Sequence, residues 1–521
     1  MSSIRNVFFV MCDQLRADHL SCYGHPYLST PNIDSLARRG VKFERAFVQS
    51  GVCGPSRMSF YTGRYVASHG ATWNRVPLSI DEITLGEYLA VRDMKLALVG
   101  KTHMMPDSHG LKRLHLDGGN ALGALLREGH FTLVDRYDGH HAEPAGGYAG
   151  YLRRRGYASD DPWTDFVISA EDEQGRIVSG WHMRNAHLPA RVHESDSETA
   201  YTTDQAIRFI ERQGDTPWAM HLSYVKPHWP YMAPAPYHNK YTLDQCLPVR
   251  RAAREREAPH PVTGAYFQQE ECANFMRDEV IAKVRPAYQG LISQLDDHLG
   301  RLWETLDRLG RWKDTLIVFT ADHGDFLGDH WLGEKELFYD TVQRVPYIVY
   351  DPSPAADATR GHSDARFVEA IDTVPTVLDA LGMPVPDHRI EGRSLLALTR
   401  NAETQAPWRD AVYSELDYSY RQARQILGRR PDACRGWMVR TEAWKYIHWD
   451  GFAPQLFDLR NDPDEFVDLG TDPTCENVRQ AMRERLLAWS LGLRNRTTVT
   501  HDDVERGTHQ YKNAGVFYGV W

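Results

Sequence analysis

The chain has 521 residues, a formal net charge of -10 and 25% charged residues. This length allows a large hydrophobic core and more than one folding unit. The acidic balance argues against a nucleic-acid partner or an anionic membrane, so any anion that the chain binds must be held locally.

The cysteines and the first residues of the chain restrict the class of protein further. The seven cysteines are irregularly spaced and include no C-x-x-C pair, so they predict neither a disulfide framework nor a zinc knuckle. The first residues form a strand-like apolar run that starts at Asn6 and ends at Asp13. A secretory leader would instead need a basic segment followed by an apolar one and a cleavage site. No uncharged apolar run reaches the length of a membrane span. From these features we expect a soluble, cytoplasmic protein without a membrane partner.

Four short apolar runs, each followed by a polar cluster, form the most regular pattern in the chain. Run 7–12 is followed by Asp13-Gln14, and run 96–99 is followed by G-K-T-H at 100–103. Run 218–225 is followed by K-P-H at 226–228, and run 316–319 leads to D-H-G at 322–324. Continuous hydrophobicity is typical of strands covered on both faces, as in a mostly parallel sheet. Ligands bind beyond the carboxyl ends of such strands. We therefore expect the four polar clusters to converge.

Segments with helical periodicity separate these runs. They are Pro31–Arg39, 84–91, 203–212 and a long amphipathic stretch whose apolar positions run from Tyr288 to Leu309. The apolar run 347–350 and the helix-like segment 371–381 continue the alternation. The pattern predicts an α/β fold with a large, mostly parallel central sheet flanked by helices.

The alternation gives way to a polar stretch at 399–407, where we place a boundary between a catalytic α/β domain, 1–400, and a C-terminal subdomain, 408–521. Four short strand candidates at 411–414, 436–439, 444–447 and 455–458 predict an antiparallel sheet, with a helix from about 477 to 491 packed on it. The tail from 500 to 521 ends in aromatic residues. Such residues are typical of an arm on a neighbouring subunit or of a segment docked on its own chain.

The segment Cys53-Gly54-Pro55-Ser56-Arg57 carries the clearest chemistry. A proline in the first turn predicts a helix with Cys53 near its N-terminus, where backbone N–H groups and the helix dipole favour an anion. Arg57 lies one turn further on and can reach back toward a tetrahedral oxyanion. A thiolate nucleophile with a lowered pKa and a cysteine that becomes oxidised both fit this arrangement. A buried cysteine in an ordinary core helix is the reading without function.

The pattern C-x-P-S-R, followed five residues after Arg57 by Thr62-Gly63, resembles the signature of type I sulfatases in the alkaline phosphatase superfamily. In that family the cysteine is converted to formylglycine, an aldehyde that hydrates to a geminal diol. The resemblance therefore implies formylglycine at Cys53, a formylglycine-generating maturation enzyme as a partner, and a small-molecule anionic ester as substrate. The C-terminal strand candidates and D-P-D-E at 462–465 also resemble the C-terminal subdomain of this family.

The metal site implied by the resemblance departs from the common sulfatase pattern. One divalent ion is assigned to Asp13, Gln14, Asp322 and His323, with the oxygen derived from Cys53 completing its shell. The common pattern is Asp-Asp with Asp-Asn and binds calcium. Gln14 removes one negative charge and His323 offers a nitrogen, so Mn2+ is favoured over Ca2+. The Asp-Gln and Asp-His pairs resemble the phosphonate monoester hydrolase branch of the superfamily.

Other motifs favour the sulfatase branch. The G-K-T-H cluster resembles the sulfatase G-K-x-H element, whereas phosphonate hydrolases carry Tyr and Thr at the positions of Lys101 and His103. By resemblance, Lys101 holds the diol and ester oxygens, and His103 takes a proton from the second hydroxyl. His228 and Lys335 would contact the ester oxygen next to the leaving group, and Asn74 would donate a hydrogen bond to the substrate.

These residues imply hydrolysis of sulfate monoesters, with aryl sulfates foremost, by double displacement through a covalent sulfoenzyme. One diol hydroxyl, held by Arg57, attacks sulfur, and the alcohol leaves with a proton from His228 or Lys335. Deprotonation of the other hydroxyl then releases sulfate. A phosphonate monoester hydrolase or phosphodiesterase using the same site is the alternative, and a non-catalytic anion- or metal-binding protein with an unmodified Cys53 also stays open. We expect a homo-oligomer, either a dimer or a tetramer.

Overall fold

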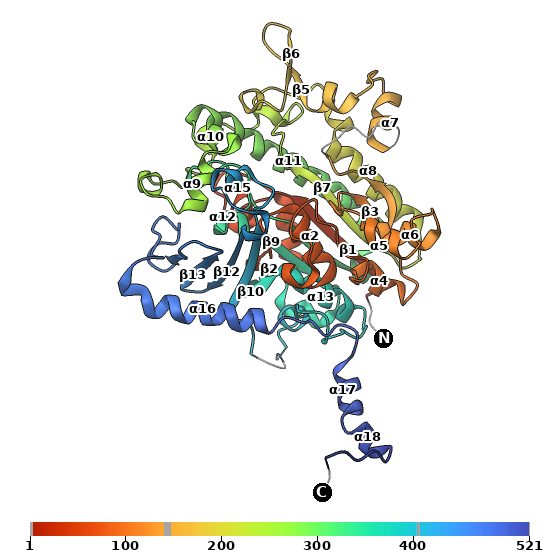
Figure 1. The fold of residues 1–521 in the computed structure, drawn as a ribbon. Coiled ribbons are helices and arrows are strands. Elements are labelled where there is room, and N and C mark those ends of the chain that lie inside the picture. Colours follow the sequence, from red (N-terminus) through yellow and green to blue (C-terminus); the bar gives the residue numbers. More distant parts are fainter. Residues whose placement is uncertain (1–3, 140–146, 403, 405–406, 520) are drawn as a thin grey trace.

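The computed structural model describes residues 4–139, 147–402, 404, 407–519 and 521. An eight-stranded sheet with the order β10-β2-β9-β8-β1-β7-β3-β4 forms its centre (Figure 1). The strands of this sheet are β1 (Asn6–Asp13), β2 (Val41–Phe47), β3 (Leu96–Gly100), β4 (Phe131–Arg136), β7 (Ala219–Pro227), β8 (Thr315–Ala321), β9 (Arg344–Tyr350) and β10 (Ser363–Glu369). Neighbouring strands are parallel except at β9, which runs antiparallel to β2 and β8. The predicted α/β class with a mostly parallel sheet is confirmed.

The four predicted strands with polar clusters are consecutive in the sheet, in the order β8, β1, β7, β3. All three pairs among them are parallel, so their carboxyl ends lie at the same edge. The sequence did not predict β2, β4 and β10. Their side chains are only partly buried, and β2 alternates between buried and half-buried positions, so none of them forms a continuous apolar run.

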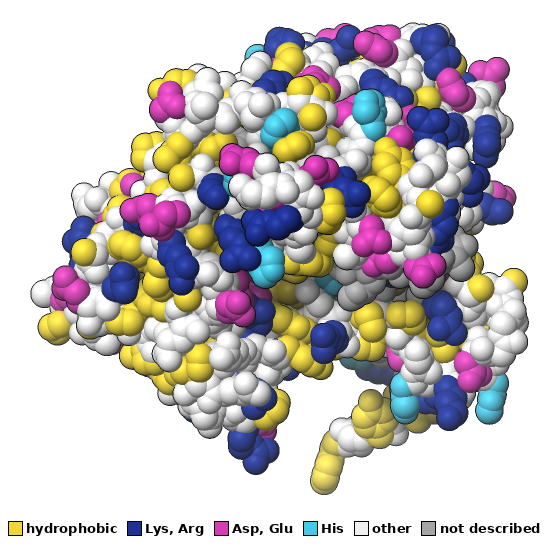
Figure 2. Space-filling view, turned by 90° about the horizontal axis from the view of Figure 1, so that it is seen from above, with side chains coloured by type: hydrophobic (Ala, Val, Ile, Leu, Met, Phe, Trp, Pro, Cys, Tyr) yellow, Lys and Arg dark blue, Asp and Glu magenta, His cyan; other side chains and the backbone are white. Residues whose placement is uncertain are grey.

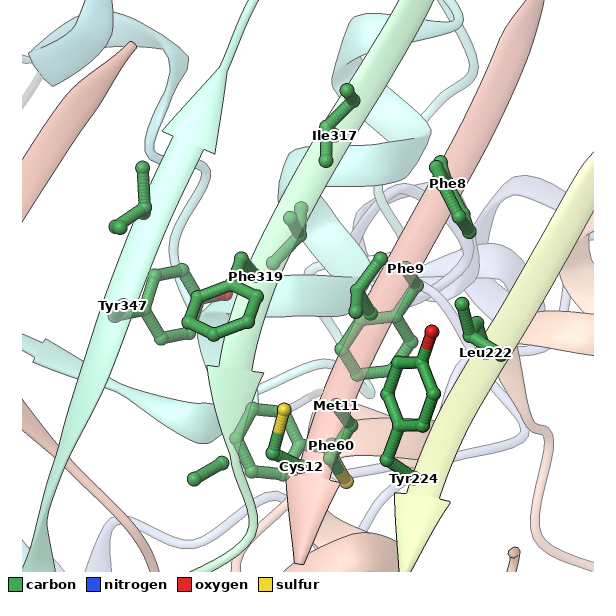
Figure 3. Close-up of a cluster of buried hydrophobic side chains, with 14 of the residues drawn as sticks. Phe8, Phe9, Met11, Cys12, Phe60, Leu222, Tyr224, Ile317, Phe319 and Tyr347 are labelled. Atoms are coloured by element: carbon green, nitrogen blue, oxygen red, sulfur yellow. The ribbon is translucent and has the colours of Figure 1, made fainter. Parts of the chain in front are cut away.

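Helices cover the sheet on both faces. Adjacent residues of a strand point to opposite sides, and Phe8 meets Trp303 of α11 (Asp278–Arg308), whereas Phe9 meets Phe60 of α2 (Cys53–Thr62). Figure 3 shows these phenylalanines between β7 and β8, with β9 running in the opposite direction beside them. The strands are therefore buried on both sides, which explains their unbroken hydrophobicity.

The predicted helices are present, with two of them longer than expected. Segment 31–39 is α1 (Pro31–Arg39), 84–91 is α4 (Leu85–Ala90) and 371–381 contains α13 (Thr373–Ala380). Segment 203–212 lies inside α8 (Glu198–Gln213), and α11 begins ten residues before Tyr288 and continues through Pro286. The other α-helices of the first 400 residues are α3 (Val66–His69), α5 (Ser108–Arg113), α6 (Ala121–Arg127), α7 (Gly147–Arg154), α9 (Pro261–Phe267), α10 (Glu270–Phe275), α12 (Asp340–Gln343) and α14 (Leu396–Thr399). A small hairpin joins β5 (Ser169–Glu171) to β6 (Ile177–Ser179).

The C-terminal part contains the predicted four-stranded antiparallel sheet. It consists of β11 (Ala411–Asp417), β12 (Arg435–Thr441), β13 (Trp444–Trp449) and β14 (Gln455–Asp458), in that order. Met482 and Leu486 of α16 (Glu476–Leu491) pack on one face of this sheet, as expected. Its other face shares a core cluster with Val52 and Phe338 of the preceding part. The predicted boundary at 400–408 includes residues 403, 405 and 406, which lie outside the described residues, and it stays a prediction.

The last elements are α15 (Gln422–Ile426), α17 (His501–Gly507) and α18 (Gln510–Asn513). The tail with α17 and α18 extends away from the body (Figure 1), and its aromatic residues, among them Phe517 and Tyr518, are exposed. Packing of this tail on a second subunit stays a prediction. On the face drawn in Figure 2, basic and acidic side chains are interspersed. Among the described residues, no helix has both the length and the apolar composition that crossing a bilayer requires.

Candidate active site

The ends of β1 and β8 bring together the two polar pairs of the sequence. Asp13 is the last residue of β1 and Asp322 follows β8, and Cys12 pairs with Ala321 immediately before them. The chain turns at Gln14 with a φ of 65°, and the Gln14 N–H donates to Asp322 Oδ1 at 3.0 Å. The convergence predicted for these two strand ends is therefore confirmed.

Cys53 faces these pairs from the first position of α2. Its Sγ lies 3.1 Å from His323 Nε2 and 3.9 Å from Asp13 Oδ1. One ligand atom each from Asp13, Cys53, Asp322 and His323 lies within 4.8 Å of the other three, and all four residues are buried. Side chains that are distant in the sequence thus surround one buried point, beside the N-terminus of a helix.

Arg57 holds the carboxylates of this cluster in place. Its guanidinium donates to Asp322 Oδ2 at 2.8 Å and to Asp13 Oδ2 at 3.3 Å. It also donates to the carbonyl oxygen of Lys101 and to Ser223 Oγ, at 2.9 and 2.8 Å. These contacts occupy four of the five N–H groups of a guanidinium. Arg57 therefore orients the two carboxylates, and its reach toward an oxyanion stays a prediction.

Two lysines contact the cluster through different members. Lys101, which directly follows β3, forms an ion pair with Asp13 at 2.5 Å. Lys335 Nζ lies 3.1 Å from Gln14 Oε1, 3.2 Å from Cys53 Sγ and 2.9 Å from His228 Nε2. The structure thus brings His228 and Lys335 together, and their contact with the ester oxygen next to the leaving group stays a prediction.

His103 and Asn74 lie near the cluster, and the hydrogen bonds described for them do not involve its members' side chains. The backbone N–H of His103 donates to Asp138 Oδ1 at 3.2 Å, and the half-buried residue lies two positions beyond Lys101. Asn74 Oδ1 accepts a hydrogen bond from the Gly54 N–H at 2.7 Å, so the amide lies beside the start of α2. A proton-transfer role for His103 and a substrate contact for Asn74 stay predictions.

The charges around the cluster fix the protonation of its members. Burial alone would raise the pKa of Asp13, but Lys101, His228 and nearby cationic groups hold it well below its ordinary value. Burial lowers the pKa of His323, which keeps the imidazole neutral and able to bind a metal. Burial, together with the negative charge of Asp13, raises the pKa of Cys53 to about 11. The unmodified thiol is therefore neutral near pH 7, which disfavours the thiolate reading of the Cys53 segment.

The donor set fits a divalent cation of intermediate hardness. Two carboxylates and a neutral imidazole already meet at one point, and Gln14 can add an amide oxygen. Gln14 Nε2 donates to Asp325 Oδ2 at 2.6 Å and lies 3.4 Å from the Tyr231 hydroxyl. These contacts turn Oε1 toward the Lys335 side of the cluster. Mixed oxygen and nitrogen ligands are typical of manganese and other transition ions, more than of calcium.

Sequence reasoning did not find several residues that support the site. Asp325 accepts a hydrogen bond from the amide of Gln14 and belongs to the run D-H-G-D. An acidic residue so close to the predicted metal ligands could have been predicted as a member of the site. Ser223 lies inside an apolar strand, and Asp138 lies in a loop far from any motif. Their roles arise from the pairing of β3 with β7 and β4, which the sequence does not specify.

The chain is similar to known proteins over most of its length. A family model described as "Sulfatase" matches residues 5–383, and one described as "N-sulphoglucosamine sulphohydrolase, C-terminal" matches residues 328–491. A multifunctional alkaline phosphatase superfamily protein, PehA, of Trinickia caryophylli is 32% identical and covers 95% of this chain and 97% of its own length. An arylsulfatase of Clostridium perfringens is 26% identical, with 89% and 90% covered.

Solved structures include two phosphonate monoester hydrolases. The enzyme of Agrobacterium radiobacter superposes with a TM-score of 0.81 at 30% identity, covering 93% of this chain and 95% of its own. The enzyme of Silicibacter pomeroyi superposes with a TM-score of 0.82 at 28% identity, covering 95% and 98%. The similarity to all of these proteins extends over nearly the whole chain.

Proposed function

This chain belongs to the sulfatase family, and from that membership we propose that it hydrolyses sulfate monoesters, with aryl sulfates as the preferred class. The family match runs over residues 5–383 and includes each predicted catalytic residue from Asp13 to Lys335. It confirms the resemblance drawn from the Cys53 segment and makes the chain an enzyme. The non-catalytic reading is thereby the weakest of the alternatives.

The family implies one divalent metal ion and a formylglycine at position 53. We assign the ion to Asp13, Gln14, Asp322 and His323, with Mn2+ favoured over Ca2+ because Gln14 replaces a carboxylate with a neutral amide and His323 replaces an amide oxygen with an imidazole nitrogen. When bound, the ion would supply positive charge to the ester oxygens. Position 53, as a hydrated aldehyde, would supply the oxygen nucleophile.

The residues of this chain would bind the ester and move its protons. Lys101, paired with Asp13, and Lys335, 3.2 Å from Cys53 Sγ, carry positive charge near position 53, where a sulfate group would lie. His228 Nδ1 lies 2.7 Å from the Trp229 carbonyl oxygen, so in the neutral ring Nδ1 carries the proton and Nε2 accepts from Lys335. The Lys335 ammonium lies 3.2 Å from Cys53 Sγ and 2.9 Å from His228 Nε2, so it is the proton donor that we assign to the leaving oxygen.

The observation that carries sulfate specificity is the placement of Lys101 at the end of β3, against Asp13. A cationic group there, followed by His103, is the sulfatase arrangement. A second candidate, hydrolysis of phosphonate monoesters or phosphodiesters, is favoured by the Gln14 and His323 pair and by the similarity to phosphonate monoester hydrolases. Both activities would use the same residues. They are distinguished by whether the protein prefers a sulfate ester or a phosphonate ester of the same alcohol.

The proposal is tested on protein co-produced with a formylglycine-generating enzyme. Mass spectrometry of the peptide with residue 53 measures conversion of the thiol side chain to an aldehyde. The values of kcat/KM for p-nitrophenyl sulfate and p-nitrophenyl phenylphosphonate are then compared on converted protein. A higher value for the sulfate supports the proposal, and a higher value for the phosphonate establishes the second candidate. Hydrolysis of neither ester by fully converted, metal-loaded protein would contradict both.

A further inference from the structure

A cavity of about 210 Å³ is lined in part by the chain neighbours of the two residues assigned to the leaving oxygen, His228 and Lys335. Trp229 and Tyr231, which follow His228 in the chain, form part of its wall, and Glu334, which precedes Lys335, forms another part. The rest of the wall comes from the loop after β6 and from α10, two elements at the upper end of the molecule in Figure 1. The cavity is therefore next to the groups that would face the alcohol of an ester.

One side of the cavity is aromatic. The rings of Trp181 and Trp229 meet edge to face with centroids 5.2 Å apart, and the ring of Trp229 lies 4.8 Å from that of His228. The exposed fraction of Trp181 is 44%, which is large for a tryptophan on a folded chain. An indole face open to a cavity attracts cations as well as apolar groups.

The other side of the cavity is acidic. Glu270, Glu271 and Glu334 line it, and its lining contains no lysine, arginine or histidine among the described residues. Arg421, which lies outside the lining, pairs with Glu271. In the part of the chain that the structure describes, the Glu334 side chain has neither a hydrogen bond nor an ion pair. Burial raises the pKa of Glu334 to about 7, although Lys335 and Arg421 act in the opposite direction.

The two neighbouring sites thus have opposite charge. Arg57, Lys101 and Lys335 make the catalytic cluster suitable for an anionic ester group. The adjoining cavity offers carboxylates and tryptophan faces without a basic side chain. We propose that this cavity binds the alcohol part of the substrate and selects alcohols that carry an ammonium group, so that the preferred substrate is an anionic ester of a cationic alcohol. This inference rests on the proposed function, because it takes His228 and Lys335 as the groups at the leaving oxygen.

The test uses two aryl esters of equal shape. One carries a p-(trimethylammoniomethyl)phenyl group, and the other carries its uncharged carbon analogue, the p-neopentylphenyl group. For each protein the ratio of the two kcat/KM values is measured. Comparing this ratio between the wild type and a variant cancels the difference in leaving-group reactivity. We expect Glu334→Gln to lower the cationic-to-neutral ratio about tenfold, because it removes the charge but keeps the shape.

Two further variants separate charge selection from a general loss of activity. Trp181→Leu keeps an apolar wall but removes the indole face, and we expect it to lower the ratio severalfold. Glu304→Gln removes a carboxylate from an exposed position of α11, away from the cavity, and should leave the ratio unchanged. If Glu334→Gln only disturbed Lys335, the neutral ester would slow at least as much as the cationic one, because its phenol is the weaker acid and depends more on protonation as it leaves. The cationic-to-neutral ratio would then stay constant or rise instead of falling. A constant ratio in both cavity variants would overturn the proposal.

A second arm keeps this test separate from the test of the function. The same two alcohols are prepared as sulfate esters and as phenylphosphonate esters. Selectivity for the alcohol can then be measured whichever of the two acid parts the enzyme cleaves. The free phenols are also titrated against the protein with tryptophan fluorescence and calorimetry, which need no turnover. Tighter binding of the cationic phenol, weakened in Glu334→Gln, supports the cavity assignment even if neither ester is cleaved. Equal or tighter binding of the neutral phenol would refute it.

Discussion

Gln14 is oriented by contacts on the side of its amide that faces away from the cluster. Asp325 Oδ2 accepts from Nε2 at 2.6 Å, so the oxygen of the same amide must face Lys335 and Cys53. The backbone N–H of Gln14 meanwhile donates to Asp322. One residue thereby links the ends of β1 and β8 and presents a neutral oxygen. His323 adds a neutral nitrogen to the same set, because its burial favours the uncharged, metal-binding form of the ring.

His323 gives a prediction at the scale of a single residue. Replacing it in His323→Asn exchanges a nitrogen ligand for an amide oxygen and brings the set closer to the calcium-binding pattern. We expect the affinity for Mn2+ to fall at least about tenfold, roughly 1.4 kcal/mol, with a smaller change for Ca2+. Metal content after dialysis against each ion, measured by plasma mass spectrometry, checks this. An unchanged Mn2+ affinity would remove His323 from the ligand set.

The segment between β8 and α12 stores backbone strain next to the site. Five residues other than glycine have positive φ there, among them Leu327, His330 and Glu334, with values of 49°, 54° and 58°. Side chains with a Cβ adopt such angles at a cost, and they keep them only where surrounding contacts hold the backbone. Lys335 belongs to this segment. The contacts that hold the segment therefore also hold the proposed proton donor.

Asp329 provides the strongest of these contacts. It pairs with Arg16, which follows β1, at 2.8 Å and with Arg285 of α11 at 2.5 Å, and it accepts from the backbone N–H of Arg250. All three charged groups are buried. The strained segment is thus fixed to one strand end, one helix and one loop by a single carboxylate.

Asp329→Asn therefore gives a prediction at the scale of elements. It would leave the buried Arg16 and Arg285 short of one negative charge, and we expect the free energy of unfolding to fall by about 3 kcal/mol or more. Asp244→Asn, at an exposed position, should change it by less than about 0.5 kcal/mol. Chemical denaturation of the two variants measures the difference. An equal free energy of unfolding for both variants would show that the contacts of Asp329 do not stabilise the segment.

The same carboxylate predicts a direction of pH dependence. Burial opposes ionisation, but Arg16 and Arg285 lower the pKa of Asp329 to about 2. A carboxyl whose pKa is lower in the folded chain stabilises the fold above its ordinary pKa of 3.8, and this contribution disappears as the pH falls toward about 2. In Asp329→Asn the contribution is absent, so the stability gap to the wild type should narrow below pH 4.

At the scale of the whole molecule, the sequence predicted the positions of strands and helices well. It predicted the contacts between their side chains poorly. The four strand ends and the helix at Cys53 could be predicted because burial on both faces produces unbroken apolar runs. The direction of β9 could not, since an apolar run such as Tyr347 to Tyr350 reads the same in either direction. The four contacts of Arg57 were also hidden, because Ser223 and the Lys101 carbonyl meet it only when β3 pairs with β7.

One arginine of the C-terminal part lies close to the catalytic site. Arg421, between β11 and α15, pairs with Glu336 at 3.0 Å and with Glu271 of α10. Glu336 is buried, accepts from the Tyr266 hydroxyl at 2.6 Å and forms an isolated bridge with Gly51. The residue before it is Lys335. A contact made by the C-terminal part is therefore one position away from the proposed proton donor.

Arg421→Ala tests whether this contact positions Lys335. Its removal leaves Glu336 without its cationic partner, so we expect the strained segment to shift and Lys335 to donate its proton less well. The value of kcat should fall about tenfold for phenyl sulfate and less for p-nitrophenyl sulfate, because the nitrophenolate needs little protonation as it leaves. Arg430→Ala, at an exposed surface pair with Asp432, should change neither rate. A loss of only stability, or an equal loss for both esters, would mean that Arg421 supports the fold without directing Lys335.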